Sequence, residues 1–160
     1  MGLFKIDKKI KIFGIEFEEF DMDNRAEFEK YLFSTSFPIN CWKMNFTYTC
    51  MFSESAVRKV LYKIIDDMYC LFVYQNSGLL IMPYFPLGVC DEKKFNAVLL
   101  KCFKIMYVCN EKDASKCIVR TAIEPQLYML NEEYFKPAKT GFGFEHTYDV
   151  KKVVGMQGKD

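Results

Sequence analysis

Histidine and cysteine are the side chains of this chain whose chemistry is easiest to recognise. His146 is the single histidine among 160 residues. A Cys–His nucleophile pair would need a cysteine beside it in space and a third group to orient the ring. The seven cysteines are odd in number, and no two have C-x-x-C spacing. This pattern fits no usual zinc site, and it favours reduced thiols that pack as small hydrophobic side chains together with a structural histidine.

Two pairs of adjacent carboxylates are candidates for acid–base chemistry. They are Asp66-Asp67 and Glu132-Glu133. Neighbouring side chains on a strand point to opposite faces, so such a pair seldom shares one substrate. Asp66-Asp67 is more simply interpreted as a turn between two apolar segments. The sequence therefore assigns no catalytic residue.

Glycine-containing segments are the candidates for phosphate binding. Gly141 and Gly143 form a G-x-G pattern, but the further glycine of a dinucleotide loop is missing and no helix follows. The segment Tyr-Phe-Pro-Leu-Gly at 84–88 directly precedes the clearest helical pattern of the chain. Backbone N–H groups before a helix can hold a phosphate, so Pro86 and Gly88 are the candidate cofactor-binding residues.

The composition indicates a folded domain without the excess of basic charge that is typical of nucleic-acid-binding proteins. Half of the residues (51%) are apolar and 17% are aromatic, which suffices for a packed core and excludes a disordered chain. The 22 basic and 21 acidic side chains nearly balance, whereas phosphate-dominated binding of nucleic acid needs a basic surface. No apolar stretch reaches the ~20 residues of a membrane span. We therefore expect one domain over residues 1–160, without a transmembrane segment and located in the cytoplasm.

Hydrophobic periodicity and turn residues predict the elements that position these groups. We expect an α+β fold with a mostly antiparallel, mixed sheet flanked by helices. The helix beginning after Asp91 carries the strongest pattern, with apolar residues at i, i+3, i+4, i+7, i+8 and i+11. The expected elements begin with one or two strands within 3–20 broken at Gly14, a helix capped by Asp23 or Asn24 and ending by Ser36, and a short helix or irregular segment within 39–54. Extended segments at 57–65, 68–74 and 79–85 follow, and then the helix from Asp91. The last expected elements are a strand at 117–120, a helix at 124–134 and a strand at 142–150.

This order of elements resembles the GNAT acyltransferase fold. There, a meander leads into a helix whose N-terminus holds the coenzyme A pyrophosphate through an Arg/Gln-x-x-Gly-x-Gly/Ala loop. The corresponding stretch 86–91 reads Pro-Leu-Gly-Val-Cys-Asp, without the basic or amide residue and without the second glycine.

Three short motifs resemble, more closely, the family named after the C-terminal domain of phosphatidylglycerol lysyltransferase. These are Asn-Phe-Thr at 45–47, the aromatic-Pro-x-Gly element at 84–88, and the strand 145–150 followed by Gly-Met-Gln-Gly-Lys at 155–159. The family is similar to two GNAT-like halves joined in one chain, and this sequence matches the first half. The resemblance implies a seam near Tyr148 and Asp149, with acyl-CoA or aminoacyl-tRNA as the donor and a second GNAT-like half or a homo-oligomer partner beside it.

Three functions follow as hypotheses. The first is the amino-terminal half of an aminoacyl- or acyltransferase-like protein that is inactive alone and forms one wall of a substrate cleft. The second is a stand-alone module that binds a protein or lipid. Its candidate anchors are Trp42, Phe46, Phe52 and Tyr134, because aromatic residues dominate interface hot spots. The third is an acetyl-CoA-dependent N-acetyltransferase.

Overall fold

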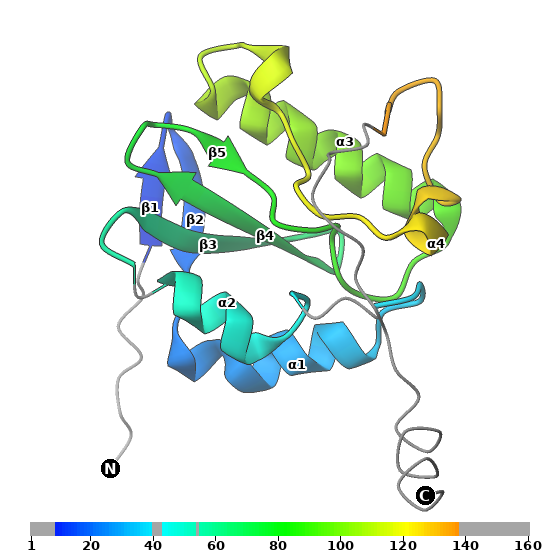
Figure 1. The fold of residues 1–160 in the computed structure, drawn as a ribbon, viewed down its shortest axis with the longest axis horizontal. Helices are drawn as coiled ribbons and strands as arrows, with labels where there is room; N and C mark the ends of the chain where they lie inside the picture. Colours follow the sequence, from blue (N-terminus) through cyan, green and yellow to red (C-terminus); the bar gives the residue numbers. More distant parts are fainter. Residues whose placement is uncertain (1–8, 40–42, 54, 138–160) are drawn as a thin grey trace, which may run out of the picture.

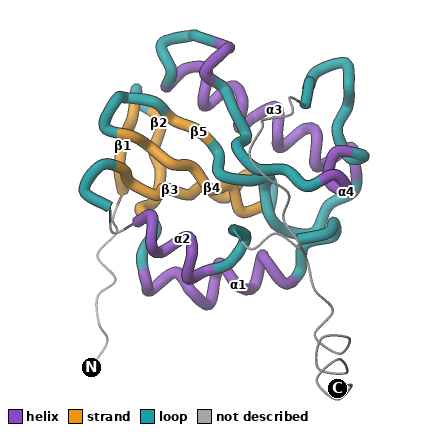
Figure 2. The backbone as a smooth tube through the Cα atoms, in the orientation of Figure 1, coloured by secondary structure: helices purple, strands orange, loops and turns teal. Residues whose placement is uncertain are grey.

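The fold has a central sheet with helices on both faces, as a computed structural model shows for residues 9–39, 43–53 and 55–137 (Figure 1). Helices α1 and α2 cover one face, and α3 and α4 lie on the other (Figure 2). The α+β class expected from the sequence is confirmed. The elements are β1 (Lys9–Ile12), β2 (Ile15–Glu19), the 3₁₀ helix η1 (Met22–Asn24), α1 (Arg25–Phe33), α2 (Phe46–Ser53), β3 (Arg58–Ile65), β4 (Met68–Gln75), β5 (Leu80–Ile81), α3 (Glu92–Cys109), the 3₁₀ helix η2 (Ala114–Lys116) and α4 (Glu124–Leu127).

The sheet has five strands in the order β1-β2-β3-β4-β5, and each neighbouring pair is antiparallel. Phe13 and Gly14 make the first hairpin turn with φ of 47° and 80°. Asp66 and Asp67 make the turn between β3 and β4 with φ of 48° and 58°. Positive φ at both turn residues matches the right-handed twist of the strands. The expected meander and its turn at 66–67 are confirmed.

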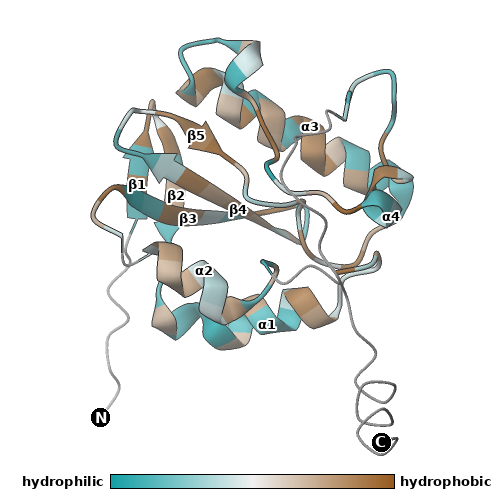
Figure 3. Ribbon diagram, viewed as in Figure 1, coloured by the Kyte–Doolittle hydropathy of each residue, from teal (hydrophilic) through white to brown (hydrophobic). Residues whose placement is uncertain are grey.

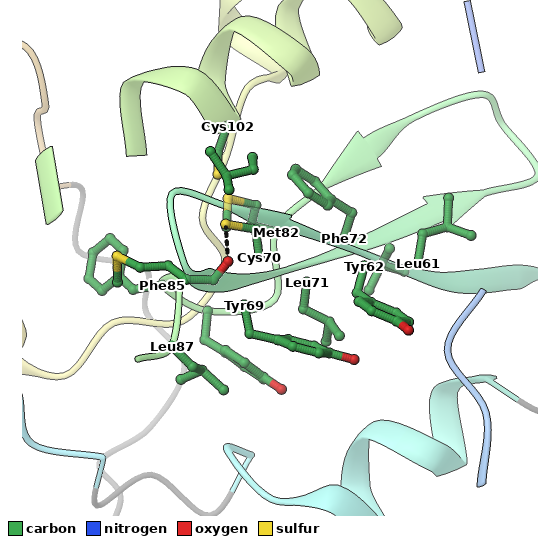
Figure 4. Close-up of a cluster of buried hydrophobic side chains, with 14 of the residues drawn as sticks. Leu61, Tyr62, Tyr69, Cys70, Leu71, Phe72, Met82, Phe85, Leu87 and Cys102 are labelled. Carbon is green, nitrogen blue, oxygen red and sulfur yellow. Dashed lines mark hydrogen bonds between the residues drawn. The ribbon is translucent and has the colours of Figure 1, made fainter. Parts of the chain in front are cut away.

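Strand β4 is the centre of the core. Its first six residues are buried on both faces, and β5 and much of β4 are brown in Figure 3. Tyr62, Tyr69 and Leu71 lie on one side of the sheet, whereas Cys102 of α3 approaches from the opposite side (Figure 4). Burial on both faces accounts for the continuous apolar runs in these strands.

Helix α3 forms as its periodicity predicts. The Asp91 carboxylate accepts a hydrogen bond from the Lys94 backbone N–H at 2.7 Å and caps the first turn. Such a cap satisfies one of the N–H groups that a helix start leaves unpaired. The side chains buried against the sheet are Phe95, Val98, Leu99, Cys102, Met106 and Cys109.

Three expected details differ in the structure. Asn24 makes no side-chain cap for α1, because its side chain closes a capping box with Asp21 around η1 instead. The helix expected at 124–134 ends after Leu127. The strand expected at 117–120 forms only a single parallel bridge, between Val119 and Met82.

The remaining predictions concern segments that the structure does not describe. The strand expected at 142–150, with His146, Tyr148 and Asp149, lies outside the described residues, as does Trp42. Among the helices that are described, none has the length and apolar character needed to cross a membrane.

Candidate functional site

The sequence places the candidate phosphate site in the turn before α3, and this turn is packed against the rest of the protein. Pro86 and Gly88 are both buried. Leu87 between them exchanges two backbone hydrogen bonds with Tyr69 of β4, at 2.8 and 2.9 Å. Gly88 has a φ of 134°, and a Cβ there would lie 3.3 Å from the Asp67 carbonyl oxygen and 3.4 Å from Tyr31 Cδ1. Gly88 is therefore explained by the close approach of the β3–β4 turn and α1.

Two backbone N–H groups of this turn, and one in the first turn of α3, have acceptors within the chain. Gly88 N–H donates to Thr35 Oγ1 at 2.9 Å, and Cys90 N–H donates to Ser36 Oγ at 3.0 Å. The Lys94 backbone N–H donates to the Asp91 carboxylate, as described above. A phosphate bound here would have to displace hydroxyl groups supplied by the end of α1, together with a carboxylate.

Charge also works against an anion in this turn. Asp91 and Glu92 are both exposed at the start of α3, where their negative charge is favoured by the helix dipole. The nearby cation, Lys94, donates from Nζ to the Val89 carbonyl oxygen at 3.0 Å. This helix start is therefore satisfied in part by this chain's own groups.

Next to this turn, two chain segments run together and then separate. Met82 and Val119 pair in parallel, and Thr121 N–H donates to the Pro83 carbonyl oxygen at 3.1 Å. Beyond Pro83 one segment stays with β4 through Leu87, and the other leads into α4. An opening between two parallel strands is a place where an elongated ligand could enter a sheet.

The connection between α1 and α2 packs next to the point where these segments separate. Phe95 packs edge-to-face against Phe37 and Phe85, with ring centroids 5.4 and 5.2 Å apart. Gln126 is buried and donates from Nε2 to the Pro38 carbonyl oxygen at 2.7 Å. The connection therefore contacts α3 through Phe37 and α4 through Pro38.

A polar cluster lies under the opposite part of the sheet, between β2, β3 and α1. The Tyr62 hydroxyl lies 2.7 Å from Glu18 Oε2 and 3.3 Å from Glu27 Oε2, and accepts from Asn24 Nδ2 at 3.2 Å. Burial, followed by its bond to Glu18, raises the pKa of Tyr62 above its ordinary value. Tyr62 is therefore a neutral phenol whose single O–H proton lies between the two carboxylates, with Glu18 the nearer acceptor.

Tyr69 stacks on Tyr62 in this cluster, with ring centroids 4.7 Å apart. Its hydroxyl is buried and has no hydrogen-bond partner within the described part of the chain. Burial raises the pKa of Tyr69, which keeps the phenol protonated.

The thiols are poorly suited to nucleophilic chemistry. Desolvation by burial raises the pKa of Cys70, Cys90 and Cys117, and raises that of Cys109 to about 11. The thiolate is the nucleophilic form, so these groups are held in the unreactive state. Cys70, Cys90, Cys102, Cys109 and Cys117 are free thiols, as the sequence predicts.

The aromatic anchors expected from the sequence divide into buried and exposed residues. Phe46 is only 6% exposed, so its prediction as an anchor is wrong, because it packs with Phe20 and Phe28. Phe52 is half-buried under the Arg58 guanidinium, 4.5 Å from its ring centroid. Tyr134 is exposed as expected.

Among the described aromatic residues that the sequence analysis did not single out, Tyr128 and Phe33 are the most exposed. Tyr128 is 81% exposed and Phe33 is 76% exposed. Phe33 lies five positions after Phe28 and one after Leu32, off the face that these two residues bury. Helical spacing alone could have identified it as exposed.

The comparisons with known proteins leave function to be inferred from this geometry. No family model, curated protein or solved structure matches the chain. Over the described ranges, no group of three or more His, Cys, Asp or Glu side chains could hold a metal ion.

Proposed function

We propose that this chain is the amino-terminal GNAT-like half of an aminoacyl- or acyltransferase-like protein. It does not bind the acyl donor itself. Its role is to pack against a second GNAT-like half and to form one wall of the substrate cleft. The proposal unites the motif resemblance with the packing of the turn before α3.

The order and pairing of the elements support the GNAT-like part of the proposal. Two helices follow the first hairpin, an antiparallel meander comes next, and α3 leads to a segment that pairs in parallel with the end of the meander. In a GNAT-like chain, a helix between two parallel segments would place the donor pyrophosphate at the start of α3, next to the point where the segments separate.

A single observation carries the non-catalytic part of the proposal. The N–H groups of Gly88 and Cys90 are bound by the hydroxyls of Thr35 and Ser36. A half that keeps the fold but satisfies its donor-binding turn internally retains the scaffold without the cofactor. The packing of Phe37 and Phe85 on Phe95, and the bond from Gln126 to Pro38, would likewise leave less room for the acyl arm of a coenzyme.

Two measurements on the intact chain test the proposal. Titration calorimetry with coenzyme A at millimolar concentration is expected to give no binding heat. Mixing the chain with the second GNAT-like half of a phosphatidylglycerol lysyltransferase-type protein is expected to give a stable complex. Aminoacyl transfer from aminoacyl-tRNA should then exceed that of the second half alone.

The opposite result in either measurement would contradict the proposal. Saturable heat with coenzyme A would favour the acetyltransferase hypothesis and end the scaffold proposal. Failure of the two halves to associate, with no gain in transfer, would leave the chain without the proposed partner.

A second candidate, a module that binds a protein or lipid, is favoured by the exposed aromatic residues. Phe33, Tyr128 and Tyr134 expose 76%, 81% and 57% of their surface. Sedimentation with neutral lipid vesicles tests the lipid form of this hypothesis. Binding that is lost on combining Phe33→Ser with Tyr128→Ser would support it, whereas a chain that stays in the supernatant would contradict it.

A further inference from the structure

The first hairpin of the sheet curls over the face that packs against α3. Phe17 of β2 packs edge-to-face on Phe72 of β4, with ring centroids 5.4 Å apart, although β3 lies between these two strands in the sheet. The Ile12 carbonyl oxygen of β1 lies 3.9 Å from Cys109 Sγ at the end of α3. The curl therefore brings β1 close to strands that are not its neighbours in the sheet.

An open groove lies between β1 and the ends of β3 and β4, on one side of the molecule (Figure 1). Its volume is about 430 Å³, which falls in the range of pockets that hold small molecules. Its lining residues are Ile10, Lys11, Ile12, Phe13, Lys59 and Tyr74. The groove thus combines apolar and aromatic surface with two cationic side chains.

Phe13 is the residue of the groove that the fold itself explains least. It makes the first hairpin turn with a φ of 47°, a left-handed conformation that is strained for a bulky side chain. The turn between β3 and β4 has Asp66 at the same place, with a φ of 48°, and a short polar side chain of this kind tolerates it. The Phe13 side chain is also 62% exposed. A strained and exposed aromatic residue at the rim of a groove indicates a binding role.

The charges around the groove leave a small positive excess. Lys59 Nζ lies 3.3 Å from Glu19 Oε1. Glu16, which faces Lys11 across the first hairpin, pairs with Lys9 at 3.1 Å. Two glutamates therefore offset two of these three lysines, and one positive charge is left over. A single charge of this sign matches a carboxylate better than a doubly charged phosphate.

We propose that this groove binds a small aromatic carboxylate, with the ring against Phe13 and Tyr74 and the carboxylate at Lys11 and Lys59. Aromatic rings attract one another in stacked and edge-to-face arrangements, and hydrogen bonds from ammonium to carboxylate groups are among the strong ones. The inference stands without the proposed function. The turn before α3 pairs with Tyr69, and the five residues of β4 from there to Tyr74 span roughly 17 Å.

An NMR titration of the full chain with naphthoate tests the proposal. We expect saturable shifts of backbone amide signals that centre on residues 10–13, 59 and 74. Naphthamide keeps the ring without the charge, and acetate keeps the charge without the ring, so each should bind about tenfold more weakly than naphthoate. The proposal fails if naphthoate gives no saturable shifts up to its solubility, if the shifts centre elsewhere, or if the three probes bind equally.

Phe13→Asn separates binding from folding. Asparagine is favoured in the left-handed turn, so the melting temperature should rise, whereas the affinity for naphthoate should fall about tenfold because a stacking ring is lost. Phe33→Asn is the matched control, because Phe33 is an exposed phenylalanine of α1 outside the groove, and it should leave binding unchanged. A Phe13 variant that binds naphthoate as well as the unmodified chain, or that melts at a lower temperature, would overturn the proposal.

Charge neutralisation gives an independent readout. Lys11→Gln and Lys59→Gln should each weaken naphthoate binding about threefold, as expected for a charge pair open to solvent. Lys93→Gln removes an exposed lysine at the start of α3 and should leave the affinity unchanged. If neither groove lysine affects binding, or if the Lys93 variant weakens it equally, the assigned carboxylate position is wrong.

Discussion

The side chain of Asn110 makes hydrogen bonds to three backbone groups from two separate segments of the chain. Oδ1 accepts from Leu80 N–H at 2.8 Å, and Nδ2 donates to the carbonyl oxygens of Leu80 and Lys116 at 2.9 and 3.1 Å. It is only 2% exposed. A buried amide that satisfies backbone groups in this way is costly to remove, because its partners stay buried.

Asn110→Ala should therefore lower the free energy of unfolding by roughly 2–4 kcal/mol, since several buried polar groups lose their partners. Urea unfolding followed by tryptophan and tyrosine fluorescence measures the change. Asn76→Ala is the matched control, because exposed Asn76 donates from its amide to a single carbonyl, that of Ala56. An equal decrease in the free energy of unfolding of the two variants would show that the hydrogen bonds of the Asn110 side chain contribute little to stability.

Gly88 carries the second prediction at the scale of single residues. Gly88→Ala should destabilise the fold by about 1–3 kcal/mol, because a Cβ would combine a strained φ with close contacts. Gly78→Ala shares the positive φ, at 84°, but its Cβ would meet nothing within 4 Å. Thermal unfolding of both variants separates the two causes, and a Gly88 variant no less stable than the Gly78 variant would refute the packing argument.

At the scale of elements, α1 and α3 are joined by hydroxyl groups. Thr35 Oγ1 accepts from Gly88 N–H and donates to the Tyr31 carbonyl oxygen at 2.8 Å. Thr35→Val keeps the shape but leaves a partly buried N–H unpaired, so we expect a loss of about 1–2 kcal/mol. Ser34→Ala, which removes an exposed hydroxyl bonded to the same carbonyl, should change stability by less than about 0.5 kcal/mol. The denaturant midpoints of the Thr35 and Ser34 variants are compared. Similar midpoints would contradict the stabilising role of the hydrogen bond between Thr35 and Gly88.

Elements with strong periodicity were predictable because local signals agree with the fold. The apolar spacing after Asp91 fixes α3, and Asp66-Asp67 forms the turn between two apolar runs. The segment at 124–134 shows where this fails. Asn96 of α3 binds the Met129 carbonyl oxygen through Nδ2 and the Asn131 N–H through Oδ1. These tertiary contacts hold the chain after Leu127 outside a continuing helix, and no pattern within the segment reveals them.

The turn before α3 was located from the sequence, but its chemistry was not. Pro86 and Gly88 do precede the long helix, and the missing basic residue was visible in the sequence. The acceptors for its N–H groups come from Thr35 and Ser36, more than fifty positions away along the chain. Polar satisfaction across such a separation depends on the tertiary fold, so a sequence pattern could indicate the place but could not show that it is filled.

At the scale of the whole molecule, the core combines apolar packing with titratable groups kept neutral. Tyr62 and Tyr69 contact side chains of α1, Cys70 is buried in β4, and Cys109 is buried at the end of α3. Burial disfavours the charged form of each acid. The stability of the fold is therefore linked to pH on the alkaline side.

The Cys109 thiol shows in which direction, and over which pH range, the stability of the fold changes. Burial raises the pKa of its thiol from about 9 to about 11. Below pH 9 both the folded and the unfolded chain keep this proton. Between pH 9 and 11 the unfolded chain loses the proton while the folded chain retains it, so stability falls as pH rises, on the order of 2 kcal/mol across the window.

Urea unfolding at pH 8, 9, 10 and 11 measures this linkage, and Cys109→Ala should make the decline less steep. Val98→Ala, which truncates a buried side chain of α3 without a titratable group, should lower stability by a similar amount at every pH and preserve the decline. The comparison rests on the pH dependence alone, because both substitutions leave a cavity. An unchanged decline in the Cys109 variant would mean that this thiol is solvated in solution, which conflicts with the packing of α3 against the β1–β2 hairpin that buries it.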